Sequence, residues 1–326
     1  MRRGRLTRLG ARRLPLRSLR TRRRRRKPTP TSTRIRIAMA DIFIDPFIQY
    51  VFMQRALAGA LILAVSCGPV GVFLMLRRMS LTGDAMSHAI LPGAAVGFLF
   101  YGLDILPMTI GGLVVGLVVA LGAGAVSRFT VQKEDASLAA LYLISLALGV
   151  LLVSWRGSSV DLMHVLFGTV LALNNEALGL IGGICFITLS VMITFWRALV
   201  AECLDPLFLR SVSRWGSPVH FLFLGIVVLN LVGGFQALGT LLSVGLMMLP
   251  AAASRFWSNR VAPMCFISIG IGMVSCFAGL VLSYHASLPS GPAIILSAGG
   301  VYALSILFGT RGVLIDLLGS GRHRAA

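Results

Sequence analysis

The chain is a series of apolar runs separated by short polar or charged stretches, beginning near residue 42. The segment 42–54 is amphipathic and broken at Pro46, which is typical of an element that lies at the membrane interface. Most later runs are close to the roughly 20 residues that a helix needs to cross a bilayer. The predicted spans are 56–76, 85–103, 105–127, 136–155, 176–198, 217–236, 239–253, 261–284 and 291–309. The pattern predicts an all-α, polytopic transmembrane helical bundle of about nine spans, with eight as the alternative if 217–253 is not two full spans.

One further apolar stretch, 161–173, is too short to cross a bilayer and carries His164. Backbone at membrane depth that does not span must be buried in protein or line a cavity, because lipid cannot satisfy its polar groups. We therefore predict a short re-entrant or outer-surface helix over 161–173.

Composition supports a membrane protein and isolates one unusual segment. Hydrophobic residues make up 56% of the chain and charged residues 13%, which excludes an ordinary soluble domain. The formal net charge of +19 comes mostly from residues 1–38, which hold 16 of the 30 Lys and Arg and no Asp or Glu. This segment has the composition of an arm for nucleic acid or anionic lipid, or of a transit peptide.

We favour a third interpretation of residues 1–38, in which the start is mis-assigned and Met39 is the true beginning. Otherwise the segment is expected to be disordered. A membrane-anchored nucleic-acid binder would leave the polytopic portion unexplained, so no nucleic-acid partner is expected. The remaining chain is predicted to be one transmembrane permease domain over 39–315, followed by a cytoplasmic tail over 316–326.

The distribution of Lys and Arg predicts the orientation, because positive residues gather in cytoplasmic loops. With the start outside, the inner segments are 77–84, 128–135, 197–216, 254–260 and 310–326. They hold twelve Lys and Arg, whereas the outer segments, counted from Met39, hold only Arg55 and Arg156. We expect the N-terminus outside and the C-terminus in the cytoplasm. Residues 1–38 would oppose this rule, which is a further reason to begin at Met39.

Several motifs of enzymes are absent from the sequence. It contains no GxxxxGK[ST] phosphate loop, no HExxH and no GxSxG. The cysteines show no CxxC spacing, and we interpret all five as small apolar residues: Cys67, Cys185, Cys203, Cys265 and Cys276. The sequence indicates a conduit rather than an enzyme, and any ATP hydrolysis would belong to a separate subunit.

Polar chemistry is densest between Arg77 and Gly93. Asp84 and His88 lie four residues apart, so a helix would place them on one face, together with Ser80 if it extended back that far. Ionisable residues in a membrane segment are a functional hypothesis by default, and a carboxylate with an imidazole suits Zn, Mn or Fe. The alternatives are that Asp84 is the N-cap of a helix beginning after Gly83, and that His88 is a packed histidine.

Two other histidines are weaker candidates. His285 and His164 are predicted at the outer face, where they could serve entry of the cargo, although a lone exposed histidine often has no function. Met247 and Met248 are soft sulfur groups near an inner end, and we interpret them as core residues.

Six motifs follow one another in a recognisable order. They are FMQRAL (52–57), VFLMLRRMSLTGDAMSHAILPG (72–93), KEDA (133–136), SVDL with LFG (159–162 and 166–168), GTLLSVGLMMLPAAA (239–253) and LPSGPA (288–293). Through them, essentially all of 47–310 resembles the permease subunit of the zinc/manganese/chelated-iron group of ABC importers.

The resemblance implies partners and a location. It implies a homodimer in the bacterial cytoplasmic (inner) membrane, with two ABC ATPase subunits on the cytoplasmic face. A periplasmic or extracellular metal-binding protein would deliver a divalent metal ion as cargo, and no cofactor would be permanently bound. The alternative is a secondary transporter or channel for metal cations that needs no ATPase.

The resemblance also implies a coupling helix in the loop 197–216. Glu202, Asp205 and Pro206 resemble the acidic entry of that helix in the family. The chain then departs from the family pattern, with Leu209 and Ser213 where Ala and Gly are usual. Arg210 follows Leu209 and Arg214 follows Ser213. These two arginines either contact the ATPase or are simply part of a positive inner loop.

Overall fold

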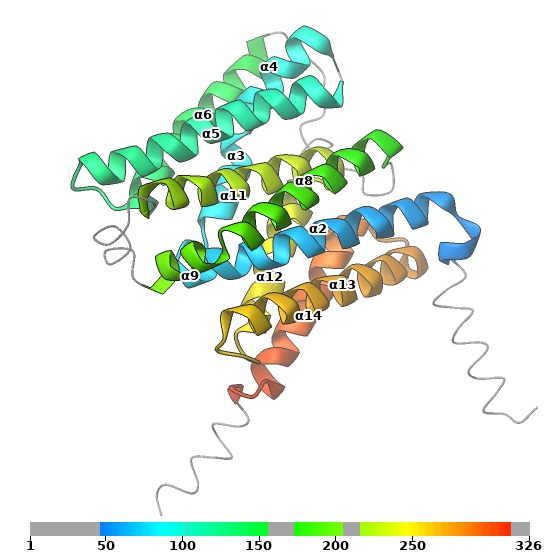
Figure 1. Ribbon diagram of the computed structural model, residues 1–326. Coiled ribbons are helices and arrows are strands. Elements are labelled where there is room, and N and C mark those ends of the chain that lie inside the picture. Colours follow the sequence, from blue (N-terminus) through cyan, green and yellow to red (C-terminus); the bar gives the residue numbers. More distant parts are fainter. Residues whose placement is uncertain (1–45, 103, 156–172, 205–215, 314–326) are drawn as a thin grey trace, which may run out of the picture. The chain divides into compact units, whose positions relative to one another are not determined.

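Every regular element that the computed structural model describes is a helix, as the sequence predicts; the described residues are 46–102, 104–155, 173–204 and 216–313 (Figure 1). The helices are α2 (Val51–Leu76), α3 (Thr82–Ala89), α4 (Leu91–Tyr101), α5 (Ile105–Phe129), α6 (Glu134–Trp155), α8 (Asn175–Thr194), α9 (Trp196–Leu204), α11 (Gly216–Leu238), α12 (Thr240–Ser254), α13 (Val261–Ala286) and α14 (Ser290–Phe308). All of these residues belong to one unit, Phe43–Ala326.

Seven of these helices are long and apolar enough to cross a membrane: α2, α5, α6, α8, α11, α13 and α14. They correspond to seven of the predicted spans, and the chain is a multi-pass membrane protein. The predicted span 239–253 is the shorter helix α12, which has 15 residues. The predicted span 85–103 is divided between α3 and α4.

The division between α3 and α4 falls at Ile90 and has a cause in the sequence. Pro92 is the second residue of α4 and has no N–H, so it cannot donate the helical hydrogen bond to the carbonyl of His88 that a continuous helix would need. The carbonyl of Ala89, at the break, accepts a hydrogen bond from Ser145 Oγ of α6 at 2.8 Å. Proline and this contact together fix where one helix ends and the next begins.

Two helices form the centre of the bundle. For both α2 and α11, 72% of the span is buried, against 22% for α6 and 28% for α5 and α14. The helix α2 packs against α8, α12 and α13, while α11 packs against α5, α8 and α12. The helices α4, α5 and α6 pack together on one side, and α12, α13 and α14 on the other, as Figure 1 shows.

Glycine allows two of these contacts to be closer than side chains would permit. Gly71 of α2 lies against the backbone carbonyl of Met247 in α12, and Gly93 of α4 lies against the backbone of Gly111 in α5. A Cβ atom at either site would overlap backbone atoms of the neighbouring helix. Small residues at helix contacts are expected where lipid supplies no hydrophobic drive for association.

Candidate functional site: a polar helix face and a cavity at one end of the bundle

A tight turn after α2 sets the direction of α3. Arg78 N–H donates to the carbonyl of Met75 and Met79 N–H to that of Leu74, which is the Schellman pattern of helix termination. Arg78 has φ of 61° in this turn, a left-handed conformation that glycine usually supplies. The side chain of Met79 is buried beyond the turn, and α3 begins three residues later at Thr82.

Asp84 and His88 lie on the open face of α3, one turn apart. The distance from Asp84 Oδ1 to His88 Nε2 is 3.9 Å, and the two side chains are 69% and 34% exposed. The other face of α3 is buried against α5, α6, α11 and α12. Ser80 lies before the helix and does not extend this polar face.

The structure also separates the alternatives for these residues. Because α3 begins at Thr82, Asp84 lies within its first turn, and the N-cap position is taken by Leu81. The interpretation of Asp84 as the N-cap is therefore wrong. His88 is one-third exposed rather than enclosed in the core.

Contacts at the break between α3 and α4 place the Asp84–His88 face near the middle of the long helices, here called mid-depth. Ile90 packs with Val228 around Gly116, and Ser145 bonds the carbonyl of Ala89. Gly116, Ser145 and Val228 lie close to the midpoints of α5, α6 and α11. His88 is therefore within one turn, and Asp84 within two turns, of the middle of three long apolar helices.

The residue before Asp84, Gly83, lies against a methionine side chain. The Met248 side chain of α12 ends over Gly83, next to Asp84, whereas Met247 is fully buried as the sequence predicts. No group of three or more His, Cys, Asp or Glu side chains could hold a metal ion within the described residues. One chain thus offers a carboxylate and an imidazole here, which is an incomplete ligand set for a metal ion.

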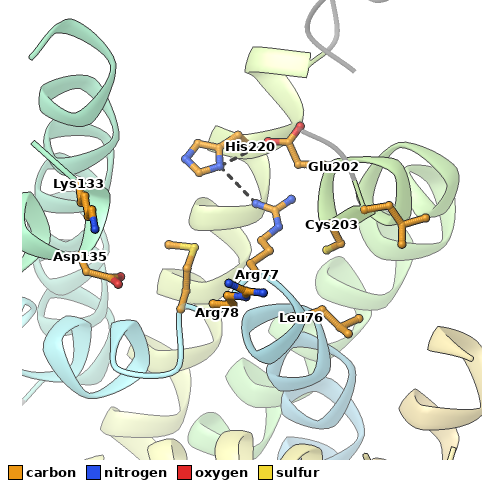
Figure 2. Close-up of a pocket in the computed structure, with 10 residues that line it drawn as sticks. Leu76, Arg77, Arg78, Lys133, Asp135, Glu202, Cys203 and His220 are labelled. Atoms are coloured by element: carbon orange, nitrogen blue, oxygen red, sulfur yellow. Dashed lines mark hydrogen bonds and ion pairs between the residues drawn. The ribbon is translucent and has the colours of Figure 1, made fainter. Parts of the chain in front are cut away.

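A second polar region is a cavity of about 550 Å³ at one end of the bundle (Figure 2). Its lining residues are Leu76, Arg77, Arg78, Met79, Lys133, Asp135, Glu202, Cys203, Leu204 and His220. Apart from Leu76 at the end of α2, they come from three of the predicted inner loops, 77–84, 128–135 and 197–216, and from the second turn of α11. The structure therefore brings these three loops together at a single end.

Arg77, His220 and Glu202 form a contact chain in this cavity. Arg77 Nη1 lies 3.3 Å from His220 Nδ1, and Glu202 Oε1 lies 3.7 Å from the same nitrogen. The guanidinium carbon of Arg77 also lies 4.1 Å above the ring of Phe223, a cation–π arrangement. Burial raises the pKa of the neighbouring Cys203 thiol, and the positive charge of Arg77 partly opposes that rise.

Glu202 has a different setting from the one that the sequence suggested. It was predicted in the acidic entry of a coupling helix, yet its side chain is only 3% exposed and faces His220. Sequence reasoning did not find the contact between Arg77 and His220, because these two residues are 143 positions apart in the chain. The sequence offered only a weak indication of this contact: Arg77 and His220 each stand near the boundary between an apolar run and a predicted inner loop.

His285 lies at the opposite end of the bundle from this cavity. It is exposed in the last turn of α13, and its Nδ1–H donates to the carbonyl of Val281 at 2.9 Å. Its neighbour Tyr284 contacts the ring of Tyr50, just before α2, while α2 ends at the cavity. The remaining predicted site residues lie outside the described residues: His164, Asp205, Pro206, Arg210 and Arg214.

Comparisons with known proteins agree with this architecture. The manganese transport system membrane protein MntC of Halalkalibacterium halodurans is 34% identical over 274 residues, which are 83% of this chain and 92% of that protein. The manganese import system permease protein ScaB of Streptococcus parasanguinis is 32% identical over 263 residues, 81% of this chain and 92% of its own.

Solved structures and a family model extend the match. The structure of PsaBC from Streptococcus pneumoniae in complex with Fab has a TM-score of 0.75 at 31% identity, and the match covers 86% of this chain and 99% of the other. An inward-facing putative metal-chelate type ABC transporter shares the fold, with a TM-score of 0.62 at 14% identity. The model of the ABC 3 transport family matches residues 49–309. The chain therefore belongs to the ABC 3 transport family and is a permease subunit of the ABC importers that its motifs resemble.

Proposed function

We propose that this chain is the membrane subunit of an importer for divalent metal ions, with Mn²⁺ as the first candidate cargo. The observation that carries the proposal is the Asp84–His88 face of α3, at mid-depth in a family permease. Carboxylate and imidazole ligands suit Mn, Zn and Fe alike. Relatives named as manganese transport and import proteins favour Mn²⁺ among the three.

The cargo site is proposed to be shared by two copies of the chain. A two-fold dimer places each residue twice around its axis, so two Asp84 and two His88 side chains would provide four ligands. The exposure of both side chains on one chain supports this arrangement, because a charged group within apolar helices needs a partner or a water-filled path. Four ligands suit a transient site that both binds and releases the ion.

Nine crossings are proposed for each copy. The helices α3 and α4 together cover 82–101, about the length of one span, and α12 is counted as a short span after Gly239. Nine crossings put the ends on opposite sides, with the N-terminus outside and the cavity of Arg77 and Glu202 in the cytoplasm. The three inner loops that meet at that cavity support this orientation.

Energy is proposed to come from two ABC ATPase subunits docked at the cavity end, and cargo from a metal-binding protein at the His285 end. The chain has no phosphate loop of its own. The segment 205–215, between α9 and α11, is the proposed coupling element, with Asp205, Pro206, Arg210 and Arg214 as its contact residues.

Metal uptake by whole cells tests the proposed function. Radioactive Mn²⁺, Zn²⁺ and Fe²⁺ are offered separately to cells that lack this chain and to the same cells complemented with it. We expect complementation to restore uptake of Mn²⁺ most strongly, and only while the partner ATPase is also present. Uptake without the ATPase would favour the secondary transporter or channel, and restoration of none of the three metals would overturn the proposal.

A further inference from the structure

We infer that Arg77, His220 and Glu202 form a latch that holds the coupling end of the permease to the helix carrying Asp84 and His88. This inference rests on the proposed function, because it concerns how movement at an ATPase reaches the cargo site. The word latch means these three side chains and the contacts between them (Figure 2).

The latch joins both sides of the segment 205–215. Glu202 stands on α9, three residues before that segment, and His220 stands in the second turn of α11, after it. Arg77 belongs to neither side, because it ends α2 and begins the link to α3. The structure thus ties the two stems of the proposed coupling element to a third element.

Arg77 makes two separate contacts with α11. A guanidinium group has only donors, so Arg77 Nη1–H donates to His220 Nδ1 at 3.3 Å, and a neutral ring then carries its proton on Nε2. One turn further along α11, the ring of Phe223 supports the guanidinium at 4.1 Å. A displacement of α11 therefore displaces Arg77 or breaks both contacts.

The burial of Glu202 indicates that this side chain selects one arrangement of the helices rather than adding to the stability of the fold. Its side chain is 3% exposed, and no described hydrogen-bond partner reaches its Oε2 atom. A buried carboxylate costs free energy unless it is compensated, and buried ionic groups are best attested as devices that select one arrangement. The Nδ1 atom of His220 can serve only one neighbour at a time: it accepts from Arg77 when the ring proton is on Nε2, and it donates to Glu202 when the proton is on Nδ1.

The link from Arg77 to α3 is short and well fixed. Arg78 and Met79 are both hydrogen bonded to the last turn of α2, and Thr82 N–H donates to the carbonyl of Met79 at 3.1 Å. Arg78 holds a left-handed conformation, which costs a non-glycine residue free energy, and its side chain lines the cavity. Movement of Arg77 is therefore passed to α3, where Asp84 follows within seven residues.

Two substitutions at His220 separate a latch from ordinary packing. His220→Gln keeps an acceptor for Arg77 and adds a donor for Glu202, whereas His220→Leu keeps a similar volume without either group. The assay uses the complete transporter in proteoliposomes and measures Mn²⁺ uptake per ATP hydrolysed. We expect a loss of about tenfold or more in His220→Leu, within the range of known coupling effects, and less than about twofold in His220→Gln.

Wild-type-like coupling in His220→Leu would overturn the latch. The latch would also be overturned if both variants lost coupling equally and no longer bound the ATPase, since that pattern indicates that His220 serves packing alone. Failure of the wild-type transporter to import any metal on ATP would instead count against the proposed function.

A second measurement follows the latch without a substitution in it. Cys203 lines the same cavity, and replacing Cys67, Cys185, Cys265 and Cys276 by Ala leaves it as the one cysteine of the chain. Its rate of labelling by a maleimide is compared between the nucleotide-free and the ATP-trapped complex. We expect a change of about fivefold or more as the latch is rearranged, comparable to known coupling effects. Equal rates in the two states would overturn the latch, whatever ion is carried.

Discussion

At the scale of single residues, the sequence predicted the pairing of Asp84 with His88 but not their surroundings. A spacing of four places two side chains on one helix face wherever that helix begins, so this prediction did not depend on boundaries. The contacts of Arg77 with His220 depend on how α2 and α11 pack, and no local pattern encodes that. Buried charge partners far apart in the chain become visible only with the fold.

Substitution of Asp84 tests its role as a metal ligand. We expect Asp84→Asn to lower Mn²⁺ uptake by about tenfold or more, because an amide is uncharged and a poorer ligand, and a two-fold dimer loses two ligands at once. His88→Ala should have a similar effect. Expression and association with the ATPase should persist in both. The assay is initial-rate uptake in cells that otherwise lack the chain.

The matched control for this experiment is Asp104→Asn. Asp104 is also exposed, and it lies just before α5, away from the α3 face. The Asp104→Asn variant should transport Mn²⁺ like the wild type. Normal uptake by Asp84→Asn would show that the carboxylate is not a ligand for the cargo.

The Cys203 thiol is predicted to react with a characteristic pH dependence. Its pKa is raised by burial, and the thiolate is the reactive form, so labelling should reach half its maximal rate at a higher pH than for a free cysteine, whose pKa is about 8.5. Arg77→Met should move that midpoint further up, because the positive charge that lowers the pKa is removed. A midpoint at or below that of free cysteine would contradict the burial seen here.

At the scale of helices, hydropathy predicted seven of the spans because each is a long uninterrupted apolar run. It missed the division of 85–103 because an average over a window hides one residue, Pro92, which decides where α3 ends. It also could not predict which glycines bring helices into contact. Gly71 and Gly270 look alike in the sequence, yet one meets a backbone carbonyl and the other faces open space.

This difference between the two glycines gives a prediction on stability. In Gly71→Ala the new Cβ atom would overlap the Met247 carbonyl, so α12 must shift, at a cost of about 1–3 kcal/mol. We expect a lower midpoint of thermal unfolding in detergent, measured by size-exclusion chromatography after heating. Gly270→Ala is the matched control and should unfold like the wild type. Equal midpoints for the two variants would mean that α2 and α12 are not in close contact.

At the scale of the whole molecule, one chain has half of what its proposed cargo site needs. It carries a polar, exposed face near the middle of its long helices, and that face supplies one carboxylate and one imidazole. The cavity lined by Arg77 and Glu202 also contains side chains that could bind a metal ion, but the positive charge of Arg77 among them would repel a cation. This contrast supports the proposal that cargo binds at α3 and coupling occurs at the cavity end, with the dimer as the functional unit.

A shared site predicts the ratio of bound metal to protein. Purified permease, confirmed as a dimer by its mass, should bind one Mn²⁺ per two chains in equilibrium dialysis, because two Asp84 and two His88 side chains complete one site. Asp84→Asn should abolish this binding, whereas His285→Ala should leave it unchanged, since the Nδ1–H of His285 donates to its own helix at the far end of α13. One ion per chain would instead place a full site within each copy. Because the described part of one chain has no group of three ligands, that ratio would also require ligands outside it and would refute the shared site.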